Sequence, residues 1–248
     1  MRIWDIDPGY LSRQRLLAEY RELHGVHTVV TEDRKGYRHH PETLRWAPFI
    51  NALRFRHLQL VSEMSIRGYR NQRPLPGPVA PVNWPTEFID SPRGQLQILD
   101  KKYANLETGR IPLPKNNQQL WAQHKYSVMA RSTEHYKEIG VSVSRPKNGP
   151  SQDSLLVDLV SQLRTQAPWP RARNSLAHMW GYVSQYAEAE QVADMQDWLQ
   201  EKPRRALAYI RKLATEHKVT YLLHSTALGE LMCHLPEALS DTDPCSAE

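Results

Sequence analysis

The hydrophobic and polar positions of this chain repeat at helical spacing along most of its length. Between residues 10 and 30, Leu16, Tyr20, Leu23 and His27 recur every three to four positions and form one apolar stripe. The same spacing predicts further helices over 48–67, 94–107, 118–131, 133–143, 152–165, 172–187, 189–200, 203–217 and 219–232. No convincing alternating strand pattern occurs, so the sequence predicts an all-α fold.

Single residues mark several of the predicted helix ends. Gly68 follows the apolar stripe of 48–67 and is expected to cap that helix, since glycine is the residue most common just past a helix C-terminus. Ser132 is expected to cap the helix that begins at Thr133. Pro203 lies in a first turn, where a proline is tolerated. In the helix predicted over 94–107, Leu106 is expected to continue the apolar stripe.

Proline-containing segments divide the pattern into two parts. Residues 71–92 are rich in proline and predict an irregular extended segment, and 107–117 (ETGRIPLPKNN) predict a short linker. The sequence therefore predicts two helical domains, 1–110 and 118–235. The polar residues 236–248 are expected to form a disordered tail.

The charge distribution assigns different roles to the two parts. Residues 1–115 carry 18 Lys and Arg against 12 Asp and Glu, whereas residues 116–248 carry 14 against 15. Fourteen of the 18 N-terminal cations are arginine, whose planar guanidinium suits phosphate. This asymmetry favours nucleic-acid binding by the first part. The two cysteines lack zinc-site spacing, and no apolar run reaches membrane-spanning length, so a soluble cytoplasmic protein is expected.

The first hundred residues carry a recognisable pattern. The segment RQRLLAEYREL (residues 13–23) resembles the opening helix of the phage pyrimidine-dimer DNA glycosylases, the endonuclease V family. The segment HLQLVSEMSIRGYRN (residues 57–71) resembles the second helix of that family. The likeness covers residues 1–107 and implies a DNA repair glycosylase with AP-lyase activity, which acts on damaged DNA such as a pyrimidine dimer or an abasic site.

That resemblance also implies the catalytic groups. In the family, the α-amino group of the residue before an arginine forms a Schiff base with the sugar, and the glutamate of a YRE triplet handles protons. These positions fall on Met1, Arg2 and Glu22, because the bulky Arg2 is expected to prevent removal of the initiator methionine. An unperturbed α-amine has a pKa of about 7.7–8.0, so much of it is neutral and nucleophilic near neutral pH.

The same overlay implies a set of DNA contacts. The residues expected to bind DNA are Arg2, Arg13, Gln14, Arg15, Tyr20, Arg21, Lys101 and Lys102. Two positions depart from the family pattern: Arg15 replaces a histidine, and Gly25 replaces a phosphate-binding arginine. The expected partner is damaged double-stranded DNA, and no membrane is expected to be involved.

The C-terminal half carries a second resemblance. WAQHKYSVMARSTEHYKEIG (residues 121–140) and NSLAHMWGY (residues 174–182) resemble the YbgA-like domain family, over about residues 118–232, and no activity follows from that likeness. From the residue types alone, His124, Lys125, Asn174, His178 and Tyr182 form either a buried hydrogen-bonding network between two helices or a pocket for a nucleotide, phosphate or base.

Alternative functions stay open from sequence. One is a nucleic-acid-binding protein without catalysis, which the changes at Arg15 and Gly25 favour. Another is a nucleotide-directed enzyme whose site lies in the C-terminal half. One pair of adjacent histidines, His39 and His40, occurs in the segment 37–42, but no carboxylate and histidine set completes a ligand cluster, so neither a metal nor a cofactor is expected.

Overall fold

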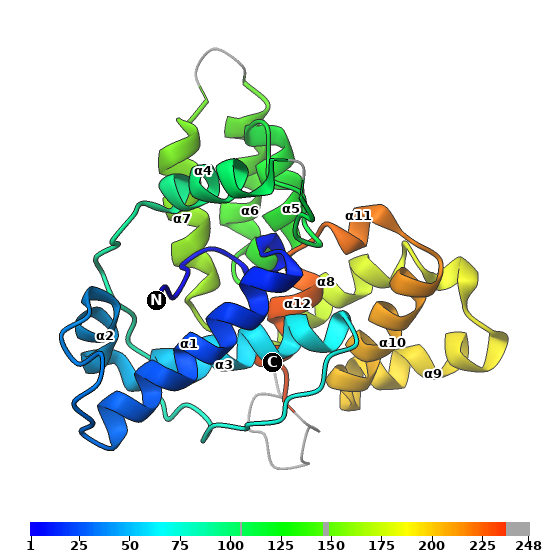
Figure 1. Ribbon diagram of the computed structural model, residues 1–248. Helices are drawn as coiled ribbons and strands as arrows, with labels where there is room; N and C mark the ends of the chain where they lie inside the picture. The colour runs from blue at the N-terminus through cyan, green and yellow to red at the C-terminus, as the bar shows by residue number, and fades with distance from the viewer. Residues whose placement is uncertain (105, 146–148, 237–248) are drawn as a thin grey trace.

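The computed structural model describes residues 1–104, 106–145 and 149–236. Figure 1 shows how its helices pack against one another. The α-helices are α1 (Arg13–Thr31), α2 (Pro41–Trp46), α3 (Ile50–Ile66), α4 (Pro92–Tyr103), α5 (Asn117–Met129), α6 (Thr133–Val143), α7 (Gln152–Leu163), α8 (Trp169–Trp180), α9 (Ala189–Glu201), α10 (Pro203–Glu216), α11 (Thr220–Leu223) and α12 (Ala227–Glu230). Short 3-10 helices cover Pro8–Tyr10, Ala47–Phe49, Ser184–Tyr186 and Leu231–Cys233.

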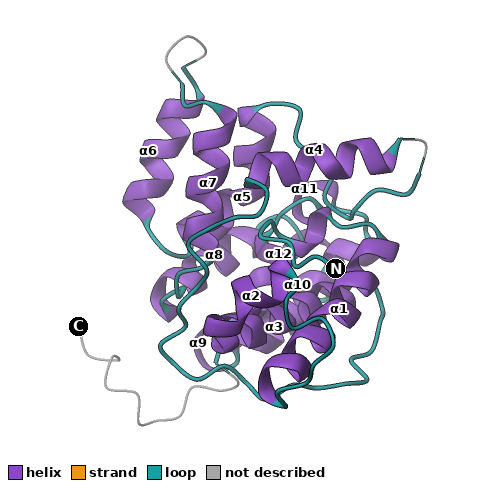
Figure 2. Cartoon of the chain, turned by 60° about the vertical axis from the view of Figure 1, so that its left-hand side comes forward, coloured by secondary structure: helices purple, strands orange, loops and turns teal. Residues whose placement is uncertain are grey.

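The all-α fold class is confirmed, since the part of the chain described here contains helices and loops and no strand (Figure 2). The predicted caps are also present. Ser132 Oγ accepts a hydrogen bond from the backbone N–H of His135 at 3.1 Å. Gly68 follows α3 with a φ of +78°, a conformation that favours glycine. Among these residues, no helix is both long and apolar enough to cross a bilayer.

The helix predicted over 219–232 is wrong as a continuous element. The structure has two short helices there, α11 and α12, separated by residues 224–226. Neighbouring segments use the backbone polar groups of this break: Thr226 N–H donates to the Gln123 carbonyl at 2.9 Å, and the Ser225 carbonyl accepts from Arg110 at 3.2 Å. Tertiary hydrogen bonds therefore replace the helical ones at this point.

Three smaller differences concern two helix ends and one short helix. The helix predicted over 172–187 ends at Trp180, and α4 ends at Tyr103, so that Leu106 is exposed rather than part of the apolar stripe. The helix α2 was not predicted, because six residues are too short to show a period. It begins at Pro41, and His40 Nδ1 accepts the Glu42 N–H at 3.1 Å. The predicted tail lies outside the described residues from position 237 onward.

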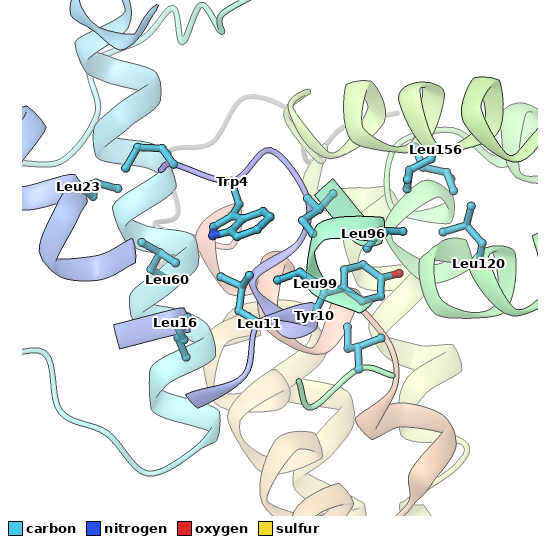
Figure 3. Packing of buried hydrophobic residues seen from close by; sticks show 14 of the residues in the cluster. Trp4, Tyr10, Leu11, Leu16, Leu23, Leu60, Leu96, Leu99, Leu120 and Leu156 are labelled. Carbon is cyan, nitrogen blue, oxygen red and sulfur yellow. The ribbon is translucent and has the colours of Figure 1, made fainter. Parts of the chain in front are cut away.

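The buried apolar residues form two clusters that do not divide at the predicted linker. The first joins the N-terminal segment, α1, α3 and α4 to α5, α6 and α7 (Figure 3). In that cluster Tyr10 and Leu99 are fully buried, as are Leu120 and Leu156 from beyond the linker. The second cluster joins the remainder of α5 to α8, α9, α10, α11 and α12. Helix α5 therefore belongs to both clusters and connects them.

A buried ion pair holds the first residues of the chain against α1 and α3. Arg56 donates to Glu19 through Nε at 2.8 Å and Nη2 at 3.0 Å, and both side chains are almost fully buried. Each partner also binds the N-terminal backbone: Glu19 Oε1 accepts the Trp4 N–H at 3.1 Å, and Arg56 donates to the Ile6 carbonyl at 2.9 Å. The pair thereby fixes the path of residues 4–6.

Asp5 anchors the same segment from its other side. Its carboxylate is buried and accepts from Arg45 of α2 at 3.0 Å and from Arg164, which follows α7, at 2.5 Å. Gln95 of α4 donates to it at 2.8 Å and accepts the Asp5 N–H at the same distance. Side chains from three separate elements thus converge on one residue close to the start of the chain.

The linker is packed rather than free. Arg110 binds Glu63 of α3 at 2.6 Å and donates to the carbonyls of Leu223 and Ser225. A Cβ on Gly109 would lie 2.4 Å from the Tyr10 backbone, so only glycine permits this approach. The linker therefore ties α3, the N-terminal segment and the C-terminal helices together.

A second buried ion pair closes the C-terminal half. Arg131, which follows α5, binds Glu230 of α12 with two parallel hydrogen bonds of 3.0 and 2.9 Å, and His234 Nε2 lies 3.2 Å from the same carboxylate. Burial alone would raise the pKa of Glu230, but Arg131 and His234 outweigh it and lower that pKa to about 2. Glu230 therefore stabilises the fold in its ionised form.

We expect Glu230→Gln to lower the free energy of unfolding by about 3 kcal/mol at pH 7. The reason is that the pKa of Glu230 is roughly two and a half units lower in the folded protein than in the unfolded chain. Since the folded pKa is depressed, the difference from the wild type should narrow as pH falls below about 4.5 and disappear towards pH 2. Urea unfolding of both proteins across this range measures it. A difference that stays constant between pH 7 and pH 3 would contradict the assignment.

Candidate active site

The carboxylate of Glu22 lies next to the first residues of the chain. Its Oε2 accepts the backbone N–H of Arg2 at 2.5 Å, and the side chain is half-buried on α1. The α-amino group of Met1 is one residue from that N–H, at a backbone distance of about 3–4 Å. The Glu22 carboxylate therefore binds the backbone one residue from the chain terminus.

The helix α1 presents its carboxylates in register with the N-terminal segment. Glu19 and Glu22 are three residues apart, so they share one face of the helix. They accept the N–H groups of Trp4 and Arg2, respectively, which alternate along the extended segment. The buried Glu19 anchors the segment, whereas the half-buried Glu22 is accessible at its end. Glu19 thus holds the segment against the core, and Glu22 stays partly exposed beside its first residues.

The Arg2 side chain is engaged within the protein. Its Nη2 lies 2.7 Å from Asp90 Oδ2, and its guanidinium lies 5.0 Å from the centre of the Trp4 ring. About a third of each charged side chain remains exposed, 31% for Arg2 and 35% for Asp90. Arg2 is therefore paired within the protein, while part of its guanidinium stays open to the predicted phosphate contact.

The exposed face of α1 lies between Glu22 and a cavity. Successive helical residues are rotated by roughly 100°, which places Gln14, Arg21 and Gly25 along one exposed strip. Glu22 lies along one flank of this strip. Leu17 and His24 lie along the other flank and line the cavity. A ligand lying on the strip would therefore contact the carboxylate on one side and the cavity on the other.

The cavity has a volume of about 410 Å³ and a basic, partly aromatic wall. Its lining residues are Leu17, Tyr20, Arg21, His24, Met64, Tyr69, Arg70, Gln72 and Arg73. Three arginines thus surround the cavity, and no acidic side chain belongs to the lining. A volume of this size lies within the range of small-molecule sites. The charge and shape suit a planar group attached to phosphate.

Tyr20 supports the cavity from within and has little exposed surface. Its hydroxyl donates to Asn71 Oδ1 at 2.7 Å and accepts the Arg73 N–H at 3.1 Å, and 8% of the residue is exposed. The predicted DNA contact of Tyr20 is thus restricted to the ring that lines the cavity. Its hydroxyl instead fixes the segment after α3.

Two histidine rings pack behind Tyr20. The ring centres of His24 and His57 are 5.1 Å apart, and both lie within 5.6 Å of the Tyr20 ring. Burial lowers the pKa of His24, and burial together with His24 lowers the pKa of His57 to about 4. His57 is therefore neutral at pH 7, and within the described residues the Nε2 atoms of both rings lack a hydrogen-bond partner.

The remaining predicted DNA contacts lie near the first turn of α1. Arg13 and Gln14 are exposed and Arg15 is half-buried. Lys101 and Lys102 are exposed in the last turn of α4, which Tyr103 holds beside α1: its hydroxyl accepts the Ser12 N–H at 2.7 Å and donates to the Tyr10 carbonyl at 2.9 Å. The two groups of cations thus belong to neighbouring helix ends.

The residues of the predicted C-terminal pocket do not converge. His124 is buried, its Nδ1 lies 2.9 Å from the Leu120 carbonyl, and burial lowers its pKa to about 4. Asn174 and His178 share an exposed face of α8 instead. Lys125 and Tyr182 come close together through Tyr126 and Tyr221. Neither the predicted network nor a pocket containing all five residues is formed.

Sequence reasoning missed the residues that position the terminus and form the cavity. Glu19 and Arg56 are ordinary helix residues in the sequence, and only their burial identifies them. Arg70 and Arg73 follow the recognised glycine of α3, so the basic ending RGYRNQR was the available signal for the cavity. Across the described ranges, no cluster of three or more His, Cys, Asp or Glu residues is arranged to hold a metal ion.

Comparison with known families matches both resemblances. Neither a curated protein nor a solved structure matched the chain. Residues 125–230 match the family model described as a protein of unknown function (DUF1722). Residues 1–76 match the family model of the pyrimidine dimer DNA glycosylases, and they include Glu22 and all the residues that line the cavity. The N-terminal part of this chain is thus similar to the pyrimidine dimer DNA glycosylases, and the C-terminal part to the DUF1722 proteins.

Proposed function

We propose that this protein is a DNA glycosylase with AP-lyase activity, whose nucleophile is the α-amino group of Met1. The observation that carries the proposal is the hydrogen bond from the Arg2 N–H to Glu22 Oε2, because that N–H is one residue from the terminal amine. The family match over residues 1–76 supports DNA as the substrate. Double-stranded DNA with a pyrimidine dimer or an abasic site is the proposed form.

The proposed reaction uses these two groups in sequence. The amine lone pair forms a bond to C1′ as the glycosidic bond breaks, and the base leaves with the bonding electrons and takes up a proton. Opening of the sugar ring gives an iminium ion between C1′ and the Met1 nitrogen. Glu22 stabilises the cationic sugar, then accepts a proton from C2′, and the 3′ phosphate leaves as the strand breaks.

The strip on α1 supports a model for the bound duplex. Arg21 and the cations at the first turns of α1 and the last turn of α4 would hold the phosphates. The cavity on the flank opposite Glu22 has room for an extruded base, with the Tyr20 ring and the arginines around it. Binding would transfer Arg2 from Asp90 to a phosphate.

The first test is borohydride trapping on duplexes that carry a cyclobutane dimer or an abasic site. We expect the protein to form a covalent adduct, because borohydride reduces the iminium to a stable amine. Intact mass measurement must first show a free Met1 amine. Acetylation of that amine alone should abolish the adduct and leave duplex binding in place. An adduct that survives acetylation would assign the nucleophile to a lysine, and no adduct on either duplex would refute the lyase reaction on these lesions.

Glu22→Gln separates proton handling from binding. We expect strand cleavage to fall by about a hundredfold or more, the usual contribution of a positioned acid–base group, because an amide cannot accept the C2′ proton. The duplex dissociation constant should change by less than about threefold, since the side chain keeps its size. Glu32→Gln, a change at an exposed glutamate after the last residue of α1, is the matched control. Unaltered cleavage in Glu22→Gln would remove this residue from the mechanism.

Gly25→Arg tests where the duplex lies. Gly25 is on the exposed strip and nothing lies within 4 Å of the position of a Cβ, so an arginine fits there without rearrangement. We expect tighter duplex binding and a salt dependence steeper by about 0.9 in the slope of log K against log salt, as for one added phosphate contact. Gly25→Ala is the control, since it raises helix propensity without adding charge. Equal binding by the two variants would show that the duplex does not pass over this strip.

A further inference from the structure

Three segments close to the C-terminal helices carry no Asp or Glu: 108–133, 164–187 and 217–229. The three segments meet in the fold, because Ser175 Oγ of α8 donates to the Tyr126 carbonyl of α5 at 2.7 Å and the Thr226 N–H donates to the Gln123 carbonyl at 2.9 Å. These sequence-distant segments are therefore neighbours in the fold, with the exposed Glu188 and Glu216 at two of their ends.

Two pairs of stacked rings lie in this region. Tyr182 stacks on Tyr221 with ring centres 4.7 Å apart and an interplanar angle of 27°. Tyr186 stacks on His217 at 4.2 Å and 7°. Both Tyr182 and Tyr186 are 40% exposed, so part of each side chain is open to solvent. We call these four residues the tyrosine platform.

Tyr126 and Lys125 adjoin one end of the platform. The Tyr182 ring lies near Tyr126 as well as Tyr221, and the Lys125 Nζ is 5.0 and 4.8 Å from the rings of Tyr126 and Tyr221. A hydrogen bond with Tyr126, together with weaker effects of Tyr221 and Lys125, lowers the pKa of Tyr182. The Tyr182 ring thus packs against two other tyrosine rings while 40% of the residue stays exposed.

Cations extend from the platform along α8. His178 is exposed one helical turn before Tyr182, and Asn174 is exposed one turn before that. Arg171 and Arg173 are exposed in the first turns of the same helix, and Lys218 is exposed beside His217. Exposed aromatic rings next to a row of basic and amide side chains match the composition of surfaces that bind single-stranded nucleic acid, where bases stack and cations follow the backbone.

We propose that the tyrosine platform and the exposed face of α8 form a second nucleic-acid site, which binds single-stranded DNA or RNA by stacking bases on Tyr182 and Tyr186. Stacking needs unpaired bases, because a duplex covers its base faces. Arg171, Arg173 and Lys218 would contact the phosphates of the strand. This site is separate from the N-terminal strip: α8 and α11 lie on the right of Figure 1, whereas the N-terminus lies on the left. The proposal therefore goes beyond the glycosylase reaction.

The test uses the full-length protein and a bromodeoxyuridine-containing single strand of about 15 nucleotides, within the length that such surfaces cover. Ultraviolet cross-linking and peptide mass spectrometry locate the contact, and we expect cross-links at Tyr182 or Tyr186. The double variant Tyr182→Ala/Tyr186→Ala should weaken single-strand binding by about tenfold or more. The matched control is Tyr182→Phe/Tyr186→Phe, which keeps both rings and should bind within about threefold of the wild type. An RNA strand of the same sequence distinguishes the two sources of unpaired bases.

Cross-links confined to residues 1–107, or equal binding by the alanine and phenylalanine variants, would overturn the proposal. The same negative result is expected if the platform contacts another protein rather than nucleic acid. Circular dichroism melting of the alanine variant checks that lost binding does not reflect unfolding. Borohydride trapping on a short lesion duplex is measured in parallel: it should be unchanged in the platform variants. If the wild type forms no borohydride adduct but still binds the single strand, only the glycosylase reaction is refuted.

Discussion

The buried pair of Glu19 and Arg56 is the interaction on which the candidate active site depends. Both charges lie in the core, and each uses its remaining hydrogen-bonding capacity on the backbone of residues 4 and 6. Removing one partner would leave an uncompensated buried charge, at a cost of several kcal/mol, and would release the start of the chain. Since Glu22 follows Glu19 on the same helix face, the pair that stabilises the fold also determines where the terminal amine lies.

Much of the helical architecture follows from local sequence. Apolar periodicity correctly located most helices, and Ser132 marked a helix start because a hydroxyl cap acts within three residues. The break at residues 224–226 could not be predicted, because it depends on hydrogen bonds to Gln123 and Arg110, about a hundred residues away. The missing α2 has too few residues for a period to appear.

The candidate site shows the same division between local and long-range information. Family likeness pointed to Glu22 and the terminus, and the structure brings these groups close together, although their catalytic roles stay a prediction. The convergence on Asp5 was not visible in sequence, because Arg164 is 159 residues distant. Sequence left two readings open for Asn174 and His178 for a related reason: four-residue spacing shows that they share a face, but only tertiary packing determines whether that face is buried or exposed.

The packed linker gives the two proposed nucleic-acid surfaces a fixed geometry. Arg110 and Gly109 join the linker to both hydrophobic clusters, so the two parts cannot turn about it as domains on a flexible tether would. A strand held at both surfaces would have to span one constant separation along one constant direction. The protein would then prefer DNA in which a lesion and an unpaired segment are separated by that one distance.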